Sequence, residues 1–157
     1  MNRCMLLALA LAGCAETLPV AATCTAPADV RVHLASGALL NPDERGAPLP
    51  TEIRVLELRD ATAFESLSFD DAWSPAPTVA GAIVSTQSVT LYPGETSELA
   101  LQPSPDTRAL VGIAIVRRPA GRTWRLIVPI ESLPCGASAT LAWLVDEYRI
   151  ERASEER

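Results

Sequence analysis

Apolar and polar residues alternate along much of this chain with a period of two residues, which is typical of half-buried β-strands. Val30, Val32 and Leu34 alternate with Arg31 and His33, and this alternation predicts the first strand. Seven more segments read as strands bounded by turn residues: Glu52 to Leu58, Ile83 to Leu91, Ser97 to Leu101, Ala109 to Arg117, Thr123 to Ile130, Ala139 to Val145 and Tyr148 to Arg152. We therefore expect about eight strands.

The segment from Asp60 to Trp73 departs from this alternation and carries helix signals. Two Ser/Thr–acid pairs fit the spacing of a capping box, and three apolar side chains would face the core above Trp73. The pairs are Thr62 with Glu65 and Ser68 with Asp71, and the apolar residues are Phe64, Leu67 and Phe69. Short strands with one helical insertion predict a single antiparallel β-sandwich domain over residues 29–152, followed by a charged tail at 153–157.

The N-terminal segment predicts export and attachment to a membrane. Arg3 precedes an apolar run from Met5 to Ala12, which is too short to span a bilayer and fits a signal peptide over residues 1–13. The sequence Leu11-Ala12-Gly13-Cys14 resembles a bacterial lipobox, in which the cysteine thiol receives a diacylglycerol. Residues 14–28 would form a flexible, lipidated tether, and Ala15 is typical of sorting to the outer membrane. The alternative is that Cys14 is only a small residue in the leader of a soluble secreted protein.

Two of the four cysteines remain after this processing. Cys4 would leave with the signal peptide and Cys14 would carry lipid, so we expect Cys24 and Cys135 to form a disulfide in an oxidising compartment. Two free thiols remain the alternative, because the sequence does not place the two Cα atoms within bonding distance.

Composition and motifs argue against several function classes. The formal net charge of −6 disfavours a nucleic-acid partner. His33 is the only histidine, and neither a phosphate-binding loop nor a Cys-x-x-Cys motif is present. Asp70 and Asp71 are adjacent on a predicted helix, where neighbouring side chains do not face each other. We therefore expect no catalytic residue, metal site, cofactor or small-molecule substrate.

An ordered set of motifs closely resembles the TssJ family, the outer-membrane lipoproteins of the type VI secretion system. Besides the lipobox, the set comprises Asn41-Pro42-Asp43 with Gly46 and Pro48, Ile53-Arg54-Val55, Phe64, Phe69, Trp73, Pro93-Gly94-Glu95, Val111-Gly112-Ile113-Ala114 and Trp124-Arg125. The resemblance spans the mature domain. The pair Cys24 and Cys135 and the charged tail are not part of the family pattern.

The resemblance implies a transthyretin-like sandwich with a helical insertion, tethered to the outer membrane and facing the periplasm. It implies a non-enzymatic subunit that anchors the periplasmic C-terminal region of the inner-membrane protein TssM, in a membrane complex that also contains TssL. The main partner contact in the family is the loop joining the first two strands, here Leu39 through Pro50.

Strand alternation independently places this loop beside two others. In a succession of antiparallel strands, the first, third and fifth connections emerge at one end of the sandwich. We expect this end to expose apolar anchors and arginines to the partner. The predicted contact residues are Leu39, Leu40, Asn41, Pro42, Asp43, Glu44, Arg45, Gly46, Tyr92, Gly94, Arg117, Arg118 and Arg122. The alternative is that Leu39 and Leu49 fold onto the core and the arginines pair with Asp43 or Glu44.

A different functional class also fits this kind of sandwich, because a fold does not determine a function. The chain could be a periplasmic ligand-binding or hydrolytic lipoprotein unrelated to secretion. Transthyretin-like hydrolases depend on several histidines, whereas an apolar binding cleft leaves no linear signature. The sequence therefore argues against the hydrolase and leaves a ligand pocket open.

Overall fold

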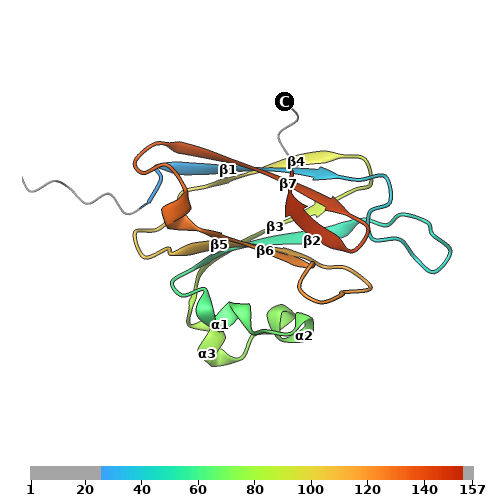
Figure 1. Cartoon of the computed structure of the whole chain (residues 1–157), viewed down its shortest axis with the longest axis horizontal. Coiled ribbons are helices and arrows are strands. Elements are labelled where there is room, and N and C mark those ends of the chain that lie inside the picture. The colour runs from blue at the N-terminus through green and yellow to red at the C-terminus, as the bar shows by residue number, and fades with distance from the viewer. Residues whose placement is uncertain (1–25, 154–157) are drawn as a thin grey trace, which may run out of the picture.

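Two four-stranded β-sheets face each other and form a sandwich (Figure 1). The computed structural model describes residues 26–153 of the chain. The strand order is β4-β1-β7-β8 in one sheet and β3-β2-β5-β6 in the other. The bounds are β1 Asp29–Ser36, β2 Thr51–Leu58, β3 Ile83–Leu91, β4 Thr96–Leu101, β5 Ala109–Ala114, β6 Arg125–Pro129, β7 Ser138–Asp146 and β8 Arg149–Arg152. These strands confirm the predicted β-sandwich.

One pairing among these strands differs from the antiparallel expectation. β1 pairs with β4 in antiparallel fashion, but it pairs with β7 in parallel, with Asp29 opposite Ser138 and Ser36 opposite Val145. The two strands run the same way because each starts at the same end of the sandwich. β7 follows a short 3₁₀ turn, η1 Ile130–Ser132, that lies at that end.

The core lies between the inward faces of the two sheets. Val30, Val32 and Leu34 of β1 are buried, as their alternation predicts. Trp143 of β7 packs against Gly112 of β5 in the opposite sheet, where an added Cβ would lie 2.5 Å from the indole ring. Only glycine therefore allows this tryptophan to sit between the sheets.

Three short helices cover the outer face of the β3-β2-β5-β6 sheet (Figure 1). They are α1 Thr62–Glu65, α2 Phe69–Trp73 and α3 Pro77–Ala80. In the second predicted pair, Ser68 caps α2 by accepting a hydrogen bond from the Asp71 amide, which confirms this cap; the Asp71 carboxylate accepts from the Ser68 hydroxyl at 2.6 Å and not from its backbone. The first is wrong: Thr62 lies inside α1, and its amide donates instead to the Asp60 carboxylate at 2.8 Å. The sequence did not predict α3, which begins at Pro77; proline is tolerated in a first helical turn, where its missing N–H would have no helical partner.

The guanidinium of Arg125 fastens the helical layer to β6. It is buried and donates hydrogen bonds to the backbone carbonyls of Phe64 and Glu65, and to that of Leu67 at 3.3 Å. Burial lowers the pKa of Arg125 below its ordinary value by desolvation, and the nearby Arg122 charge lowers it further. One cation thus supplies donors to several carbonyls at and just after the C-terminal end of the short α1 segment, where intrahelical donors run out.

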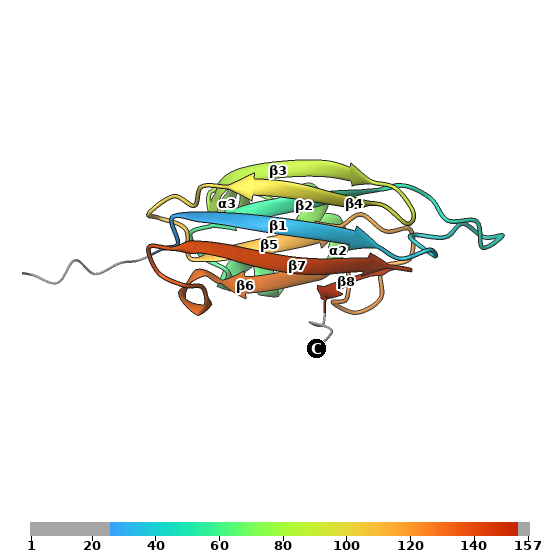
Figure 2. The same cartoon turned by 90° about the horizontal axis from the view of Figure 1, so that it is seen from above.

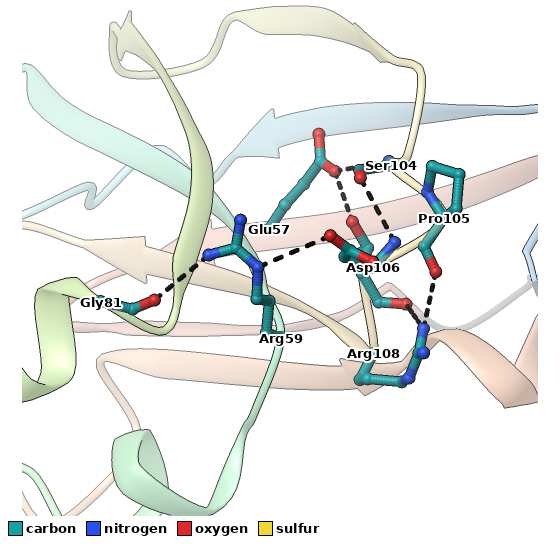
Figure 3. Close-up of polar contacts among 8 residues, drawn as sticks. Glu57, Arg59, Gly81, Ser104, Pro105, Asp106 and Arg108 are labelled. Carbon is teal, nitrogen blue, oxygen red and sulfur yellow. Dashed lines mark hydrogen bonds and ion pairs between the residues drawn. The ribbon is translucent and has the colours of Figure 1, made fainter.

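The two ends of the sandwich are chemically different, and Figure 2 shows them at opposite ends of its long axis. We call the end where β1 and β7 begin the tether end, and the end where they finish the loop end. At the tether end the buried carboxylate of Glu57 accepts hydrogen bonds from the Thr107 hydroxyl and the Ser104 amide (Figure 3). It also accepts one from the Ser85 hydroxyl. Arg59 also forms an ion pair with Asp106 at 3.8 Å there.

Several predicted segments lie outside the described residues. These are the signal peptide at 1–13, the lipidation residue Cys14, the tether up to residue 25 including Cys24, and the tail from residue 154. They stay predictions. Within residues 26–153, no helix has the length and hydropathy needed to cross a bilayer.

Replacing Arg125 with methionine tests the attachment of the helical layer. Arg125→Met keeps much of the side-chain volume but leaves buried carbonyls without donors, so we expect the free energy of unfolding to fall by about 2–3 kcal/mol. Urea unfolding followed by tryptophan fluorescence measures this change. Arg31→Met, at an exposed position of β1, is the matched control and should leave stability almost unaltered. Equal stability of the two variants would contradict the assigned role.

Candidate functional site

Four connections form the loop end. They are residues 37–50 between β1 and β2, 92–95 between β3 and β4, 115–124 between β5 and β6, and the turn at 147–148 between β7 and β8. Figure 2 shows the β1–β2 connection, in blue-green, extending furthest beyond the strands. The sequence placed the first three at this end. It predicted the turn between β7 and β8 but did not assign it to this end, although the same alternation rule places the seventh connection of the chain here.

The tip of the β1–β2 loop is an ordered turn built around Asp43. Its carboxylate accepts hydrogen bonds from the amides of Arg45 and Ala47, at 2.8 and 2.9 Å. Gly46 has a φ of +82°, a left-handed conformation that glycine adopts without strain. The bonds from the Ala47 and Arg45 amides lower the pKa of Asp43 below its ordinary value of 3.8, and the nearby Arg117 charge adds to this effect. The ionised carboxylate of Asp43 therefore stabilises the turn at the tip of the β1–β2 loop.

Leu40 and Asn41 correct the sequence prediction, because neither faces solvent. Leu40 is fully buried and Asn41 is 5% exposed. Leu40 joins the core, and its carbonyl accepts a hydrogen bond from the Leu49 amide at 2.9 Å. A partner that approached the loop end would reach neither side chain without rearranging the loop.

Leu39 and Tyr92 are the exposed apolar residues of the loop end. They are 52% and 51% exposed, and they are the two large hydrophobic side chains that stand out to solvent in the described part of the chain. Leu39 therefore does not fold onto the core, whereas Leu49 is half-buried. Tyr92 is held in place because the Ser36 hydroxyl donates to its carbonyl at 2.6 Å. Gly94, with a φ of +75°, completes this tight turn.

Arginines surround these apolar residues. Arg117, Arg118 and Arg122 are exposed on the β5–β6 connection. Among the described residues, no ion pair links them to Asp43 or Glu44, so the alternative of local charge pairing is not supported. Arg118 instead lies over the ring of Tyr148, with 5.9 Å between its guanidinium carbon and the ring centroid. Tyr148 belongs to the turn between β7 and β8, the fourth connection of the loop end.

The polar groups elsewhere in the described residues have structural roles. His33 pairs with Glu98 at 3.1 Å on the outer face of its sheet. No group of three or more histidine, cysteine or acidic residues within residues 26–153 could hold a metal ion. Cys135 is disulfide-bonded, and the other three cysteines of the chain lie outside the described residues. The pairing of Cys24 with Cys135 therefore stays a prediction.

Comparison with known proteins gives the family of the chain. Residues 28–150 match the family model described as type VI secretion lipoprotein, VasD, EvfM, TssJ, VC_A0113. The chain belongs to this family. As a TssJ-family lipoprotein it is a structural component of a secretion apparatus and not an enzyme. No curated protein sequence is significantly similar to the chain.

Solved structures share the fold of this TssJ-family chain. The T6SS lipoprotein TssJ1 from Pseudomonas aeruginosa matches with 24% identity and a TM-score of 0.73, over 83% of this chain and 98% of that one. Serratia marcescens Lip, a membrane-bound component of the type VI secretion system, matches with 20% identity and a TM-score of 0.71, over 80% and 97%. A chain in the structure of the TssM C-terminal domain from EAEC matches with 16% identity and a TM-score of 0.70, over 80% and 98%.

The pH dependence of the loop tip follows from Asp43. Because the folded pKa is lowered, the carboxylate stabilises the turn at every pH above its ordinary value of 3.8, and this contribution is lost as the pH falls through the lowered pKa. We expect the NMR amide signals of Arg45 and Ala47 to titrate with a midpoint below 3.8. The same amides in Asp43→Asn, which keeps an acceptor oxygen that does not titrate, should show no such step. A midpoint at or above the ordinary value would contradict this assignment.

Proposed function

We propose that this lipoprotein is held in the outer membrane by an acylated Cys14, faces the periplasm, and binds the periplasmic C-terminal region of TssM through its loop end. In this role it connects the outer membrane to the membrane complex that contains TssM and TssL. Membership of the type VI secretion lipoprotein family supports the role in secretion. The lipobox that precedes the domain supports the acylation of Cys14.

The main support for a binding site at the loop end is the solvent exposure of Leu39 and Tyr92. Apolar side chains exposed on a soluble domain mark interaction sites when they gather in one region. Here the two large exposed hydrophobic residues of the described chain are both at the loop end, on the first and third connections. Each is attached to ordered backbone, so each can enter a partner pocket at little entropic cost.

The surrounding charges suit an interface of this kind. Arginine is enriched among the residues that contribute most to binding, together with tryptophan and tyrosine. Arg117, Arg118 and Arg122 provide three guanidinium groups beside the apolar anchors, without carboxylate partners in the described residues. Such groups can form bidentate hydrogen bonds with carboxylates of a partner.

The arrangement along β1 separates the membrane from the partner. β1 begins where the tether enters the domain and ends at the β1–β2 loop, and a strand of eight residues spans about 26 Å. Figure 2 shows the start of β1 and the β1–β2 loop at opposite ends of the sandwich, which supports a binding end that is separate from the lipid anchor. A partner can occupy the loop end without competing with the lipid surface.

The competing class is a ligand-binding lipoprotein unrelated to secretion. The family match covers nearly the whole described domain and is specific to type VI secretion lipoproteins, so it does not favour this class. No observation at the loop end favours a small ligand either, because Leu39 and Tyr92 project into solvent.

Substitution of the exposed anchors tests the binding site. Leu39→Asp and Tyr92→Ala each remove an exposed apolar contact, so we expect each to weaken the affinity for the periplasmic C-terminal region of TssM by at least about tenfold. Biolayer interferometry with the full chain in detergent measures this affinity. Thr140→Asp, at an exposed position of β7 away from the loop end, should bind like the unmodified chain. Unchanged affinity in both loop-end variants would refute the site.

Replacement of the predicted lipidation residue tests the anchor. Cys14→Ser removes the thiol that would receive lipid, so we expect the protein to leave the outer-membrane fraction and appear in the soluble periplasmic fraction. Density-gradient fractionation with immunoblotting measures this distribution. Cys135→Ser serves as the cysteine control and should remain with the membrane. Continued sedimentation of Cys14→Ser with the outer membrane would show that another segment provides the attachment.

A further inference from the structure

Asn41 is a buried polar residue inside an otherwise exposed loop. It is 5% exposed, and its φ of 43° is left-handed, a conformation that asparagine tolerates better than most residues. Burial of an amide without hydrogen-bond partners is unfavourable, so its partners explain why it lies there.

The partners of Asn41 belong to different connections of the loop end. Its amide N–H donates to the Glu147 carbonyl at 2.7 Å, on the β7–β8 turn. Its side-chain Oδ1 accepts from the Arg117 amide at 2.8 Å, on the β5–β6 connection. Its Nδ2 donates to the Thr51 hydroxyl at 3.4 Å, at the start of β2. One residue of the β1–β2 connection is thereby bonded to the β5–β6 connection, to the β7–β8 turn and to the start of β2.

Further contacts reinforce this arrangement. The Thr51 hydroxyl itself donates to the Ile115 carbonyl, at the start of the β5–β6 connection. The Tyr148 hydroxyl donates to the Pro42 carbonyl at 2.9 Å, directly after Asn41. Arg118, next to the bonded Arg117, lies over the Tyr148 ring. Of the residues proposed to contact the partner, Arg117 is itself bonded in this network, Arg118 is its neighbour, and Leu39 lies two positions before Asn41.

We infer that Asn41 is a positioning residue for partner binding: it holds the β1–β2, β5–β6 and β7–β8 connections as one preassembled surface, although it does not face the partner. This inference rests on the proposed function, in which the loop end binds TssM. Separate loops would lose conformational entropy when they become ordered on binding. A preassembled surface avoids that loss, so affinity depends on a buried amide that the partner does not touch.

Asparagine meets all the requirements of this position together. Glycine adopts the left-handed backbone conformation but has no side-chain amide. Alanine has no side-chain amide either, and it adopts the left-handed conformation only with strain. Aspartate has the acceptor for Arg117 but cannot donate to Thr51, and it would place a charge in a buried site. Asn41→Gly therefore removes the side-chain bonds while keeping the backbone conformation accessible.

The test measures affinity and loop order in the same variant. In the full chain in detergent, we expect Asn41→Gly to weaken the affinity for the periplasmic C-terminal region of TssM by at least tenfold, a loss of about 1.4 kcal/mol. We expect hydrogen exchange to accelerate together in residues 42–48 and 117–123, because both segments lose their common attachment. Exchange in the strands should stay slow, which shows that the variant folds.

A matched control separates positioning from general stability. Thr107→Val breaks the 2.7 Å hydrogen bond to the buried Glu57 carboxylate at the tether end, a polar network of comparable burial (Figure 3). We expect it to lower the melting temperature like Asn41→Gly but to keep full affinity for the partner. If both variants lost affinity in proportion to their melting temperatures, Asn41 would be only a stabilising residue and the inference would be overturned.

The outcomes also distinguish this inference from the proposed function. Full affinity in Asn41→Gly, together with lost affinity in Leu39→Asp, would overturn the positioning role and leave the binding site intact. Full affinity in Leu39→Asp, Tyr92→Ala and Asn41→Gly alike would overturn the proposed site itself. Weak affinity in Asn41→Gly with normal exchange in both loops would mean that the residue acts by another route, and it would overturn the inference as well.

Discussion

The backbone hydrogen bonding of β1 is the interaction on which the rest of the structure depends. This strand pairs along both edges, with β4 on one side and β7 on the other, while Val30, Val32 and Leu34 fill the core beneath it. Because β1 and β7 run in parallel, their ends coincide, and the connections that follow them emerge together. The tether end and the loop end are therefore fixed at opposite limits of one rigid strand pair.

Buried polar side chains form hydrogen bonds with groups that the backbone pairing of the sheets does not reach. Arg125 provides donors for carbonyls of the helical layer, Glu57 provides acceptors at the tether end, and Asn41 provides both at the loop end. Each lies where the chain leaves regular structure, which is where backbone groups lose their usual partners. The connecting segments are ordered for this reason, and the domain can present loops of defined shape.

This order explains how a small sandwich serves as an adhesive subunit of a secretion apparatus. The family provides the lipoprotein character, and the fold provides a surface at the end of the sandwich opposite the start of β1. Leu39 and Tyr92 extend from turns that are themselves tied down, by the Leu40 and Asn41 contacts in one case and by Ser36 in the other.

Much of the fold was predictable from local pattern. The two-residue period located the strands, since inward side chains must alternate with outward ones in a sheet that has one buried face. Ser68 with Asp71 located the start of α2, because a cap bond joins residues three apart. The same alternation of strand directions placed three of the four connections at one end, and it therefore grouped Leu39, Tyr92 and the arginines as predicted contact residues.

Tertiary structure alone decided which loop residues are buried. Leu40 and Asn41 follow exposed Leu39 in a stretch of turn residues, and no local pattern separates them. Asn41 is buried because Arg117 and Glu147, 76 and 106 positions away, bring backbone groups to it. Likewise, the parallel pairing of β1 with β7 and the contact of Tyr148 with Pro42 join segments distant in sequence. The sequence by itself determined the strands, their alternation and the exported, lipidated character that it predicts. The packing of distant segments decided which side chains a partner can reach, because burial is a property of neighbours that meet only in the folded chain.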